Sequence, residues 1–256
     1  MLLRRVKDEQ MSLNALLAAD ILMARRQGQR AEKPLPALTV DEAYEVQAVV
    51  IARLAETVGG WKIAIVDGTP VAAPLAAGTV LPSGSSLAFD PEAPFKIETE
   101  LGFTLRHDLP ARPNPYSRDD IIAAVESMHA SFEIVGARLG EPPDVAFTAF
   151  LADNLGNAYT VATRGGALDI LLPPRALLRR QGEFCAEGTH PNADPLAPLV
   201  AYANRQADAL GGLKKGQLII TGSFNKAIPV TANARFEGAF QGLAPVEITF
   251  VAKGHT

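Results

Sequence analysis

The spacing of hydrophobic residues changes along the chain, from a helical period near the N-terminus to alternation in the body. Residues 12–27 are rich in Ala and Leu at helical spacing, which predicts a helix. Thr39-Val-Asp-Glu42 has the form of a capping box, and an apolar stripe continues from it to about residue 54. From Trp61 onward β-branched residues, glycine and proline dominate, which favours strands and turns.

The later pattern predicts a β-rich body with two inserted helices. The helices are expected at 118–129 and 195–210, and His129 is expected at the C-terminal end of the first, where a cation interacts favourably with the helix dipole. Strands are expected from Trp61 onward and at 80–89, 95–105, 131–139, 153–162, 170–172, 182–185, 217–221 and 246–251. The chain is therefore expected to be an α+β protein, with a helical region at 1–60 and a mixed β domain at 61–256.

Two glutamates share one face of the predicted strand 95–105. Apolar residues fill most of its odd positions, whereas Glu98 and Glu100 occupy successive even positions. Alternate residues of a strand project to the same side, so the two carboxylates lie roughly 7 Å apart. At an effective dielectric of about 20 these charges repel by about 2 kcal/mol, and a divalent cation between them would reverse that cost. The same pattern is also common on a solvated strand face, so the pair alone does not distinguish a metal site from a solvated face.

Glu133 is a third acidic candidate, because it lies in the otherwise apolar strand Ser131-Phe-Glu-Ile-Val135. A buried carboxylate needs a partner, and Arg138 is close in sequence. If Glu133 instead meets Glu98 and Glu100, the three form an all-oxygen site of the kind that suits Mg²⁺ or Mn²⁺.

Lys62 and two short polar segments leave alternatives open. Lys62 follows Trp61 at the start of the β body and is either an exposed lysine, a cation near an anionic substrate, or a lysine whose lowered pKa permits proton transfer. Asp153-Asn154 has the composition of a turn. Thr221-Gly-Ser223 is either a turn or a cradle for a carboxylate, built from backbone N–H and hydroxyl groups.

Composition excludes several classes of protein. The 256 residues are 48% hydrophobic and 20% charged, which supports a sizeable core and argues against disorder. A net charge of −4 without a basic block argues against nucleic-acid binding. We expect no membrane span and no signal peptide, and the one cysteine, Cys185, excludes an internal disulfide framework or a multi-Cys zinc site. A cytoplasmic protein is expected.

Seven short motifs follow one another in the order of a known family. They are Thr39-Val-Asp-Glu-Ala-Tyr-Glu-Val-Gln47, Gly60-Trp-Lys-Ile63, Val80-Leu-Pro-Ser-Gly84, Ile97-Glu-Thr-Glu-Leu101, Phe132-Glu-Ile-Val135 with Arg138, Ala152-Asp-Asn154 and Ile220-Thr-Gly-Ser223. In this order the chain resembles the 2-keto-4-pentenoate hydratase and 4-oxalocrotonate decarboxylase branch of the fumarylacetoacetate-hydrolase-like superfamily. The resemblance implies a mixed β-roll body, of the kind in the fumarylacetoacetase C-terminal domain, behind the helical region.

The resemblance also implies an enzyme and its site. It implies a lyase that hydrates a small 2-hydroxydienoate or 2-oxo acid, such as 2-oxopent-4-enoate, in the catabolism of aromatic compounds. The implied site has Mg²⁺ or Mn²⁺ ligands Glu98, Glu100 and Glu133, catalytic residues Lys62 and Asp153, and substrate-binding residues Arg138, Asn154, Thr221 and Ser223. Decarboxylation of an oxalocrotonate-type acid, C–C hydrolysis of an acylpyruvate or β-diketone, and a catalytically impaired paralogue remain alternatives. A homo-oligomer is expected, with a sister decarboxylase or hydratase as a possible partner.

The chain departs from the family pattern around the substrate. Gly136 and Ala137 stand where the family usually has Asp-Ser, and Leu155 follows Asp-Asn where a small residue is usual. The metal-ligating set is therefore expected to be intact, whereas the residues that select the substrate are expected to differ.

Overall fold

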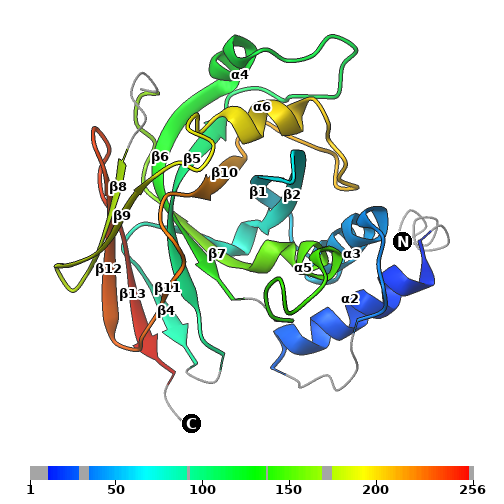
Figure 1. The fold of residues 1–256 in the computed structure, drawn as a ribbon, viewed down its shortest axis with the longest axis horizontal. Coiled ribbons are helices and arrows are strands. Elements are labelled where there is room, and N and C mark those ends of the chain that lie inside the picture. The colour runs from blue at the N-terminus through cyan, green and yellow to red at the C-terminus, as the bar shows by residue number, and fades with distance from the viewer. Residues whose placement is uncertain (1–10, 29–34, 91–92, 137, 169–174, 254–256) are drawn as a thin grey trace.

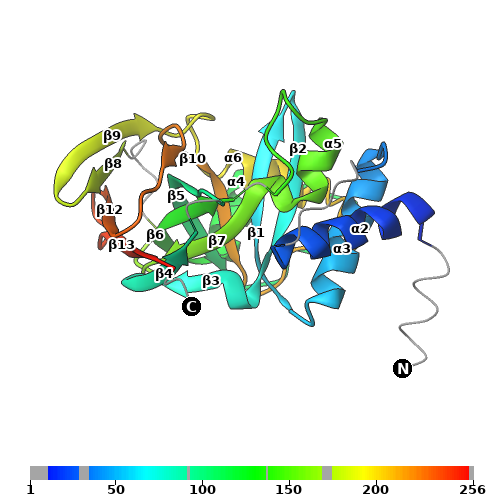
Figure 2. The same ribbon diagram turned by 90° about the horizontal axis from the view of Figure 1, so that it is seen from below.

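The computed structural model describes residues 11–28, 35–90, 93–136, 138–168 and 175–253, and two β-sheets with flanking helices make up the fold. Figure 1 shows a curled sheet through the middle of the molecule, with a second sheet on one side and the N-terminal helices α2 (Leu13–Arg26) and α3 (Val40–Arg53) on the other. The turned view also places the second sheet and these helices at opposite ends (Figure 2). The predicted α+β class with an N-terminal helical region is confirmed.

The curled sheet has eight strands of mixed direction in the order β2-β1-β10-β5-β6-β7-β3, with β11 beside β5. Their bounds are β1 Val58–Val66, β2 Thr69–Ala76, β3 Val80–Pro82, β5 Lys96–Leu105, β6 Val125–Val135, β7 Asn157–Ala162, β10 Leu218–Ser223 and β11 Ile228–Pro229. β1 pairs with β10 in parallel, whereas β5, β6 and β7 are antiparallel. The long pair β5–β6 lies near the centre of the sheet and carries the acidic residues.

The second sheet has five strands in the order β4-β13-β12-β8-β9. Their bounds are β4 Ser85–Phe89, β8 Arg175–Arg180, β9 Glu183–Thr189, β12 Ala234–Phe240 and β13 Val246–Ala252. This sheet packs closely on β6, because a Cβ at Gly238 of β12 would lie 2.6 Å from the buried ring of Phe132. Successive residues of a strand face opposite sides, so Glu133 points away from this core toward the concave face of the curled sheet.

The N-terminal helices pack at the other end of the curled sheet. Among the described residues no helix is long and apolar enough to cross a membrane. The side chain of Ser12 caps α2, and Thr39 with Glu42 forms the predicted capping box of α3. Apolar residues of both helices form one hydrophobic cluster with β2 and with the short helix α5 (Phe147–Ala152). The helical region is therefore joined to the β body through α5, next to the polar segment at 153–157.

The helix expected at 118–129 is shorter and leads directly into a strand. Helix α4 covers Arg118–Ala124, and β6 begins at Val125 because the chain from there pairs along the whole length of β5. His129 therefore lies inside a strand and not at a helix end, and its Nδ1 donates to the carbonyl of Thr163, 2.8 Å away. Pairing with β5 overrides the helical spacing of this segment.

The helix expected at 195–210 is also shorter. Helix α6 covers Ala197–Ala203. The side chain of Asn204 then accepts from the backbone N–H of Tyr116 and donates to its carbonyl, at 2.6 and 3.0 Å. These bonds hold the side chain of Asn204 at the helix end, and the following residues up to Leu210 form no helix.

Most predicted strands are present with shifted boundaries. Those expected at 131–139, 153–162 and 182–185 are β6, β7 and β9, whereas β8 and β12 have no counterpart in the sequence prediction. The segment 80–89 forms two strands as expected, but β3 joins the curled sheet and β4 joins the second one. The strand expected at 170–172 lies outside the described residues.

Candidate metal centre

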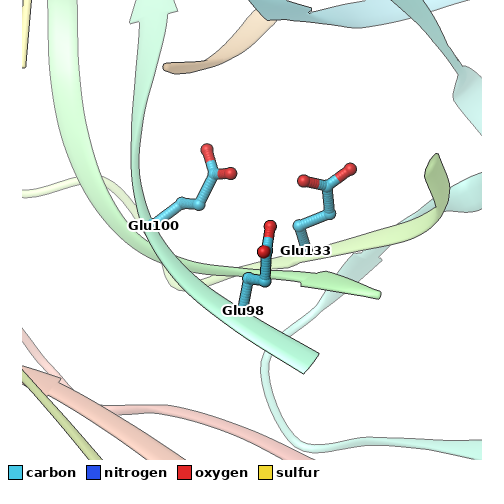
Figure 3. A group of neighbouring side chains, drawn as sticks. All are labelled: Glu98, Glu100 and Glu133. Carbon is cyan, nitrogen blue, oxygen red and sulfur yellow. The ribbon is translucent and has the colours of Figure 1, made fainter. Parts of the chain in front are cut away.

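Three carboxylates meet on the concave face of the curled sheet. In the register of β5 and β6, Glu98 is directly opposite Glu133, and Glu100 is opposite Ser131. The three glutamate side chains extend from the two strands into one common space (Figure 3). One carboxylate oxygen of each lies within 4.8 Å of those of the other two. The structure thus brings together the three acidic residues that the sequence singles out.

The cluster is costly to ionise without a cation. Glu100 and Glu133 are fully buried, and Glu98 is partly buried. At an effective dielectric of about 20, two carboxylates 4.8 Å apart repel by about 3 kcal/mol. Burial, followed by the charge of Glu133, raises the pKa of Glu98 to about 7 and the pKa of Glu100 well above its ordinary value. The metal-free cluster therefore holds protons at neutral pH.

These residues fit a hard divalent cation. All three offer carboxylate oxygen, and the buried Oε1 of Glu100 has no hydrogen-bond partner among the described residues. An unpartnered buried carboxylate oxygen is unfavourable, and coordination to a cation would satisfy it. Oxygen donors suit Mg²⁺ or Mn²⁺ better than zinc or copper. Chemistry and burial thus agree on the kind of ion that this centre could hold.

Lys62 of β1 lies beside the carboxylates. Its Nζ is 2.8 Å from Oε2 of Glu133 and donates to the carbonyl oxygen of Leu155 at 3.1 Å. Burial alone would lower the pKa of Lys62, but the charges of Glu133, Glu98 and Glu100 outweigh burial, so the pKa is raised. Lys62 is therefore a cation next to the acidic cluster, and the alternative of a lowered pKa is wrong for the metal-free protein.

Two neutral groups orient the buried carboxylates. Nδ2 of Asn157 donates to Oε1 of Glu133 at 3.0 Å, and the backbone N–H of Gly222 donates to Oε2 of Glu100 at 2.9 Å. Gly222 has φ of +132°, in the region that favours glycine. Of the two readings of Thr221-Gly-Ser223, a plain turn or a backbone cradle for a carboxylate, the structure thus shows a backbone N–H that binds a carboxylate, that of Glu100. The role of Asn157 is one that sequence reasoning missed, because no pattern in the sequence links it to Glu133.

His190 supports the segment that binds Glu100. Its Nε2 donates to the carbonyl of Thr221 at 3.1 Å, and its Nδ1 accepts from the backbone N–H of Asn192 at 3.2 Å, so the ring is neutral. The hydroxyl of Ser223 donates to the carbonyl of Asn225, so this hydroxyl is already engaged within the turn. Oγ1 of Thr221 is buried without a hydrogen-bond partner among the described residues. Of the two predicted substrate-binding hydroxyls, Thr221 alone thus lacks a protein partner.

Asp153 and Arg138, expected to act on and bind the substrate, bind each other. The backbone N–H and Nε of Arg138 donate to the two carboxylate oxygens of Asp153. Nη2 of Arg138 also donates to the carbonyls of Asp153 and Asn157, at 3.1 and 2.9 Å. Asp153 is fully buried, so this pair braces the turn, and Arg138 is not the partner of Glu133.

The turn that follows Asp153 has an uncommon backbone. Asn154, Leu155 and Gly156 have φ of +56°, +52° and +75°. A left-handed conformation costs roughly 1–2 kcal/mol for a residue that is not glycine, and such strain is typical of functional sites. The turn directs the carbonyl of Leu155 to Nζ of Lys62, while Nδ2 of Asn154 donates to a backbone carbonyl at 3.3 Å. The strained turn thus positions Lys62.

Curated proteins of related sequence are hydratases. A 2-keto-4-pentenoate hydratase from Paraburkholderia phymatum is 29% identical over 160 residues, which cover 60% of this chain and 60% of that protein. One from Paraburkholderia xenovorans is 27% identical over 238 residues, which cover 84% of this chain and 85% of that protein. The match to the first thus spans less than two thirds of that relative's length. No family model matches the chain.

Solved structures show the same fold. The 4-oxalocrotonate decarboxylase from Pseudomonas putida G7, complexed with magnesium and adipate, superposes with a TM-score of 0.79 at 22% identity and covers 94% of this chain and 100% of its own. Fumarylpyruvate hydrolase from Pseudomonas aeruginosa, in complex with Mn²⁺ and pyruvate, has a TM-score of 0.57 at 15% identity and covers 75% of this chain and 89% of its own. At these identities the likeness establishes the fold, and it agrees with the sequence relatives.

Proposed function

We propose that this chain, which is similar in sequence to 2-keto-4-pentenoate hydratases and in fold to a 4-oxalocrotonate decarboxylase, is a member of that branch of the fumarylacetoacetate-hydrolase-like superfamily and a divalent-metal-dependent lyase that hydrates a small 2-hydroxydienoate or the corresponding 2-oxo acid. The observation that carries this proposal is the buried trio of glutamates with Lys62 beside it. Curated relatives named for such acids support the substrate class, among them a 2-hydroxyhexa-2,4-dienoate hydratase from Comamonas testosteroni that is 27% identical.

Glu98, Glu100 and Glu133 would hold Mg²⁺ or Mn²⁺ in this proposal. When bound, the cation supplies a Lewis acid for the carboxylate and 2-oxygen of the substrate, where negative charge develops. The task of the protein is to keep the ligands in place, and Asn157 and the N–H of Gly222 do this for Glu133 and Glu100. Such supporting hydrogen bonds fix the orientation of metal-ligating carboxylates.

Lys62 is the group that moves protons. An ammonium group has three N–H donors, and the described residues provide partners for two of them, at Glu133 and Leu155. The third donor is left for the substrate. Because the pKa of Lys62 is raised, the side chain is protonated at neutral pH, and in this proposal it acts as the acid that gives a proton to a substrate carbon. Both oxygens of Asp153 are bound to Arg138, so we assign Asp153 a positioning role.

Hydration of 2-hydroxypenta-2,4-dienoate balances without a further reactant. The 2-hydroxyl group loses its proton and C5 gains one, which gives the conjugated 2-oxopent-3-enoate. Water then adds its oxygen to C4 and a proton to C3, and the product is 4-hydroxy-2-oxopentanoate. The net change is the gain of one water, so the protein needs to supply only charge stabilisation and proton transfer.

Metal-dependent turnover of the purified protein tests the proposal. After treatment with a chelator, added Mg²⁺ or Mn²⁺ is expected to restore the loss of dienol absorbance with 2-hydroxypenta-2,4-dienoate. Glu133→Gln is expected to lower turnover and Mn²⁺ affinity by at least roughly 100-fold, because loss of a ligand should exceed the roughly 10- to 100-fold loss that follows from changing a residue that only supports a ligand. Glu126→Gln, which changes an exposed glutamate of the same strand, is the matched control and should change neither.

Lys62→Met separates proton transfer from metal binding. It is expected to lower turnover by at least roughly 100-fold, as for a general acid–base residue, while Mn²⁺ affinity stays at or above the original value because a competing cation is removed. Turnover that needs no metal, or that survives Glu133→Gln, would overturn the proposal. Cleavage of acylpyruvates in place of dienoate hydration would favour the hydrolase alternative.

A further inference from the structure

An apolar cavity adjoins the candidate metal centre. It has a volume of about 310 Å³ and lies between β1 and the segment that carries α5. It is lined by Lys62, Ala64, Val66, Pro142, Phe147, Phe150 and Leu155. Lys62 and Leu155 also belong to the centre, because Nζ of Lys62 contacts Glu133 and donates to the carbonyl of Leu155. The cavity and the carboxylate cluster therefore share one wall.

Strand β1 sets the direction of the cavity. Lys62, Ala64 and Val66 project from one face of β1, whereas Trp61 and Ile63 are buried in the core on the other face. A strand rises by about 3.3 Å per residue, so Val66 lies about 13 Å beyond Lys62 along β1. Lys62 therefore marks the end next to the carboxylates, and Val66 marks the far end.

Aromatic residues of α5 form the opposite wall. Phe147 and Phe150 line the cavity, and Phe150 packs on the turn that follows the helix. A Cβ at Gly156 would lie 3.0 Å from Cε2 of Phe150, and Gly156 has φ of +75°. The aromatic wall is thus packed against the same turn that directs the carbonyl of Leu155 to Lys62.

The described lining of the far part of the cavity is uncharged. Among the described lining residues, Lys62 is the one charged side chain, and it is paired with the acidic cluster. Outside the lining, Arg138 is paired with Asp153 and Lys96 with Glu141 at 2.8 Å, whereas Arg26, which interacts with the charges of Arg138 and Asp153, does not line the cavity. A carboxylate placed against these apolar side chains would lose part of its hydration without gaining a hydrogen-bond donor from the lining, which is unfavourable.

We propose that this cavity receives an uncharged alkyl or aryl tail of the 2-oxo or 2-hydroxydienoic acid and selects against a second carboxylate at the end of that tail. The inference rests on the proposed function and names its substrate class. Each water of the liquid occupies about 30 Å³, so 310 Å³ holds roughly ten groups of that size, enough for a butyl or phenyl tail. Decarboxylation of a dicarboxylic acid needs the second carboxylate, so the cavity favours hydration of a monocarboxylic one.

Two saturated 2-oxo acids of equal carbon number test the inference without turnover. 2-Oxohexanoate ends in a methyl group, and 2-oxoadipate ends in a carboxylate. Calorimetric titration of the Mn²⁺-loaded protein is expected to show at least roughly 100-fold tighter binding of 2-oxohexanoate. Equal affinities, or tighter binding of 2-oxoadipate, overturn the inference and leave the proposed function standing. Absence of metal-dependent binding of either acid overturns the proposed function itself.

Val66 allows the converse test. It is partly exposed at the end of β1, so a lysine in its place can reach the cavity without full burial. Val66→Lys is expected to strengthen 2-oxoadipate binding at least roughly tenfold, through a charge-assisted hydrogen bond to the distal carboxylate. Val66→Met, an uncharged control of similar length, should leave the preference unchanged. A folded Val66→Lys protein, judged by its melting temperature, that gains no affinity for 2-oxoadipate overturns this placement of the tail.

Discussion

Glu98→Gln removes one charge from the buried carboxylate cluster and keeps the size of the side chain. Burial, and next the charge of Glu133, raises the pKa of Glu98 to about 7 in the folded metal-free protein, compared with an ordinary value of 4.5. At pH 8 Glu98 is therefore ionised in both states, but its negative charge is less favourable in the folded protein than in the unfolded chain, which lowers the stability of the fold. The glutamine variant is expected to be more stable than the original protein at that pH when no metal is present.

The magnitude and sign of this effect follow from the two pKa values of Glu98. The difference between about 7 and 4.5 corresponds to about 3 kcal/mol, since one pKa unit is worth about 1.36 kcal/mol. Because the folded pKa is raised, the folded state binds more protons between these values, and stability falls as the pH rises through this window. Glu98→Gln should thus be nearly neutral at about pH 4 and stabilising by about 3 kcal/mol at about pH 8.

Urea unfolding at both pH values, with a chelator present, measures the predicted difference. Mn²⁺ at 1,000 times its dissociation constant should then reverse the order at pH 8, because it stabilises the original protein by about 4.1 kcal/mol, more than the variant's advantage of about 3 kcal/mol, and the variant lacks one ligand. Glu126→Gln is the control for loss of an exposed charge. The reasoning about Glu98 is refuted if the variant gains equal stability at both pH values, or if Mn²⁺ stabilises it as strongly as the original protein.

Two further predictions concern residues that support the site. Arg138→Met removes the ion-pair partner of the buried carboxylate of Asp153 and is expected to lower the free energy of unfolding in urea by about 3–5 kcal/mol. The double variant with Asp153→Leu should recover much of that loss, and no recovery would show that the ion pair is not the cause. Burial lowers the pKa of His190, whose neutral ring forms hydrogen bonds with Thr221 and Asn192. Below about pH 6.5 the unfolded chain therefore binds more protons at this residue than the folded protein does, and the stability of the fold falls as the pH falls. His190→Gln is expected to flatten this part of the thermal-unfolding profile, and an unchanged slope would contradict the assignment.

The part of the carboxylate centre that depends on local periodicity could be predicted from the sequence. Glu98 and Glu100 share a face because a strand alternates, and this requires no knowledge of the rest of the fold. The position of Glu133 opposite Glu98 depends on the register of two strands that are far apart in sequence. Motif order along the chain anticipated that pairing, whereas the apolar pattern around Glu133 showed only that the carboxylate needed a partner.

Long-range contacts explain the elements and partners that sequence reasoning missed. Helix α5 precedes the polar turn where a strand was expected to begin, and its aromatic residues cover the cavity. Sequence proximity favours Arg138 as a partner of Glu133, but the turn at 153–156 brings the carboxylate of Asp153 to Arg138, and Glu133 pairs with Lys62. Residues close in sequence thus proved a poor guide to ion pairs once the chain reversed direction between β6 and β7.

The departures from the family pattern have different physical consequences. At Gly136 a Cβ would lie 2.8 Å from the ring of Phe95, so the missing side chain accommodates packing of the core, and the neighbouring Ala137 lies outside the described residues. Leu155 instead lies at the centre itself, because its carbonyl binds Lys62 and it lines the apolar cavity. A larger apolar residue here adds hydrophobic surface to the wall that the cavity shares with the acidic cluster. The three glutamates therefore match the family motif, and the chain differs from it in the lining of the cavity that would receive the tail of the substrate.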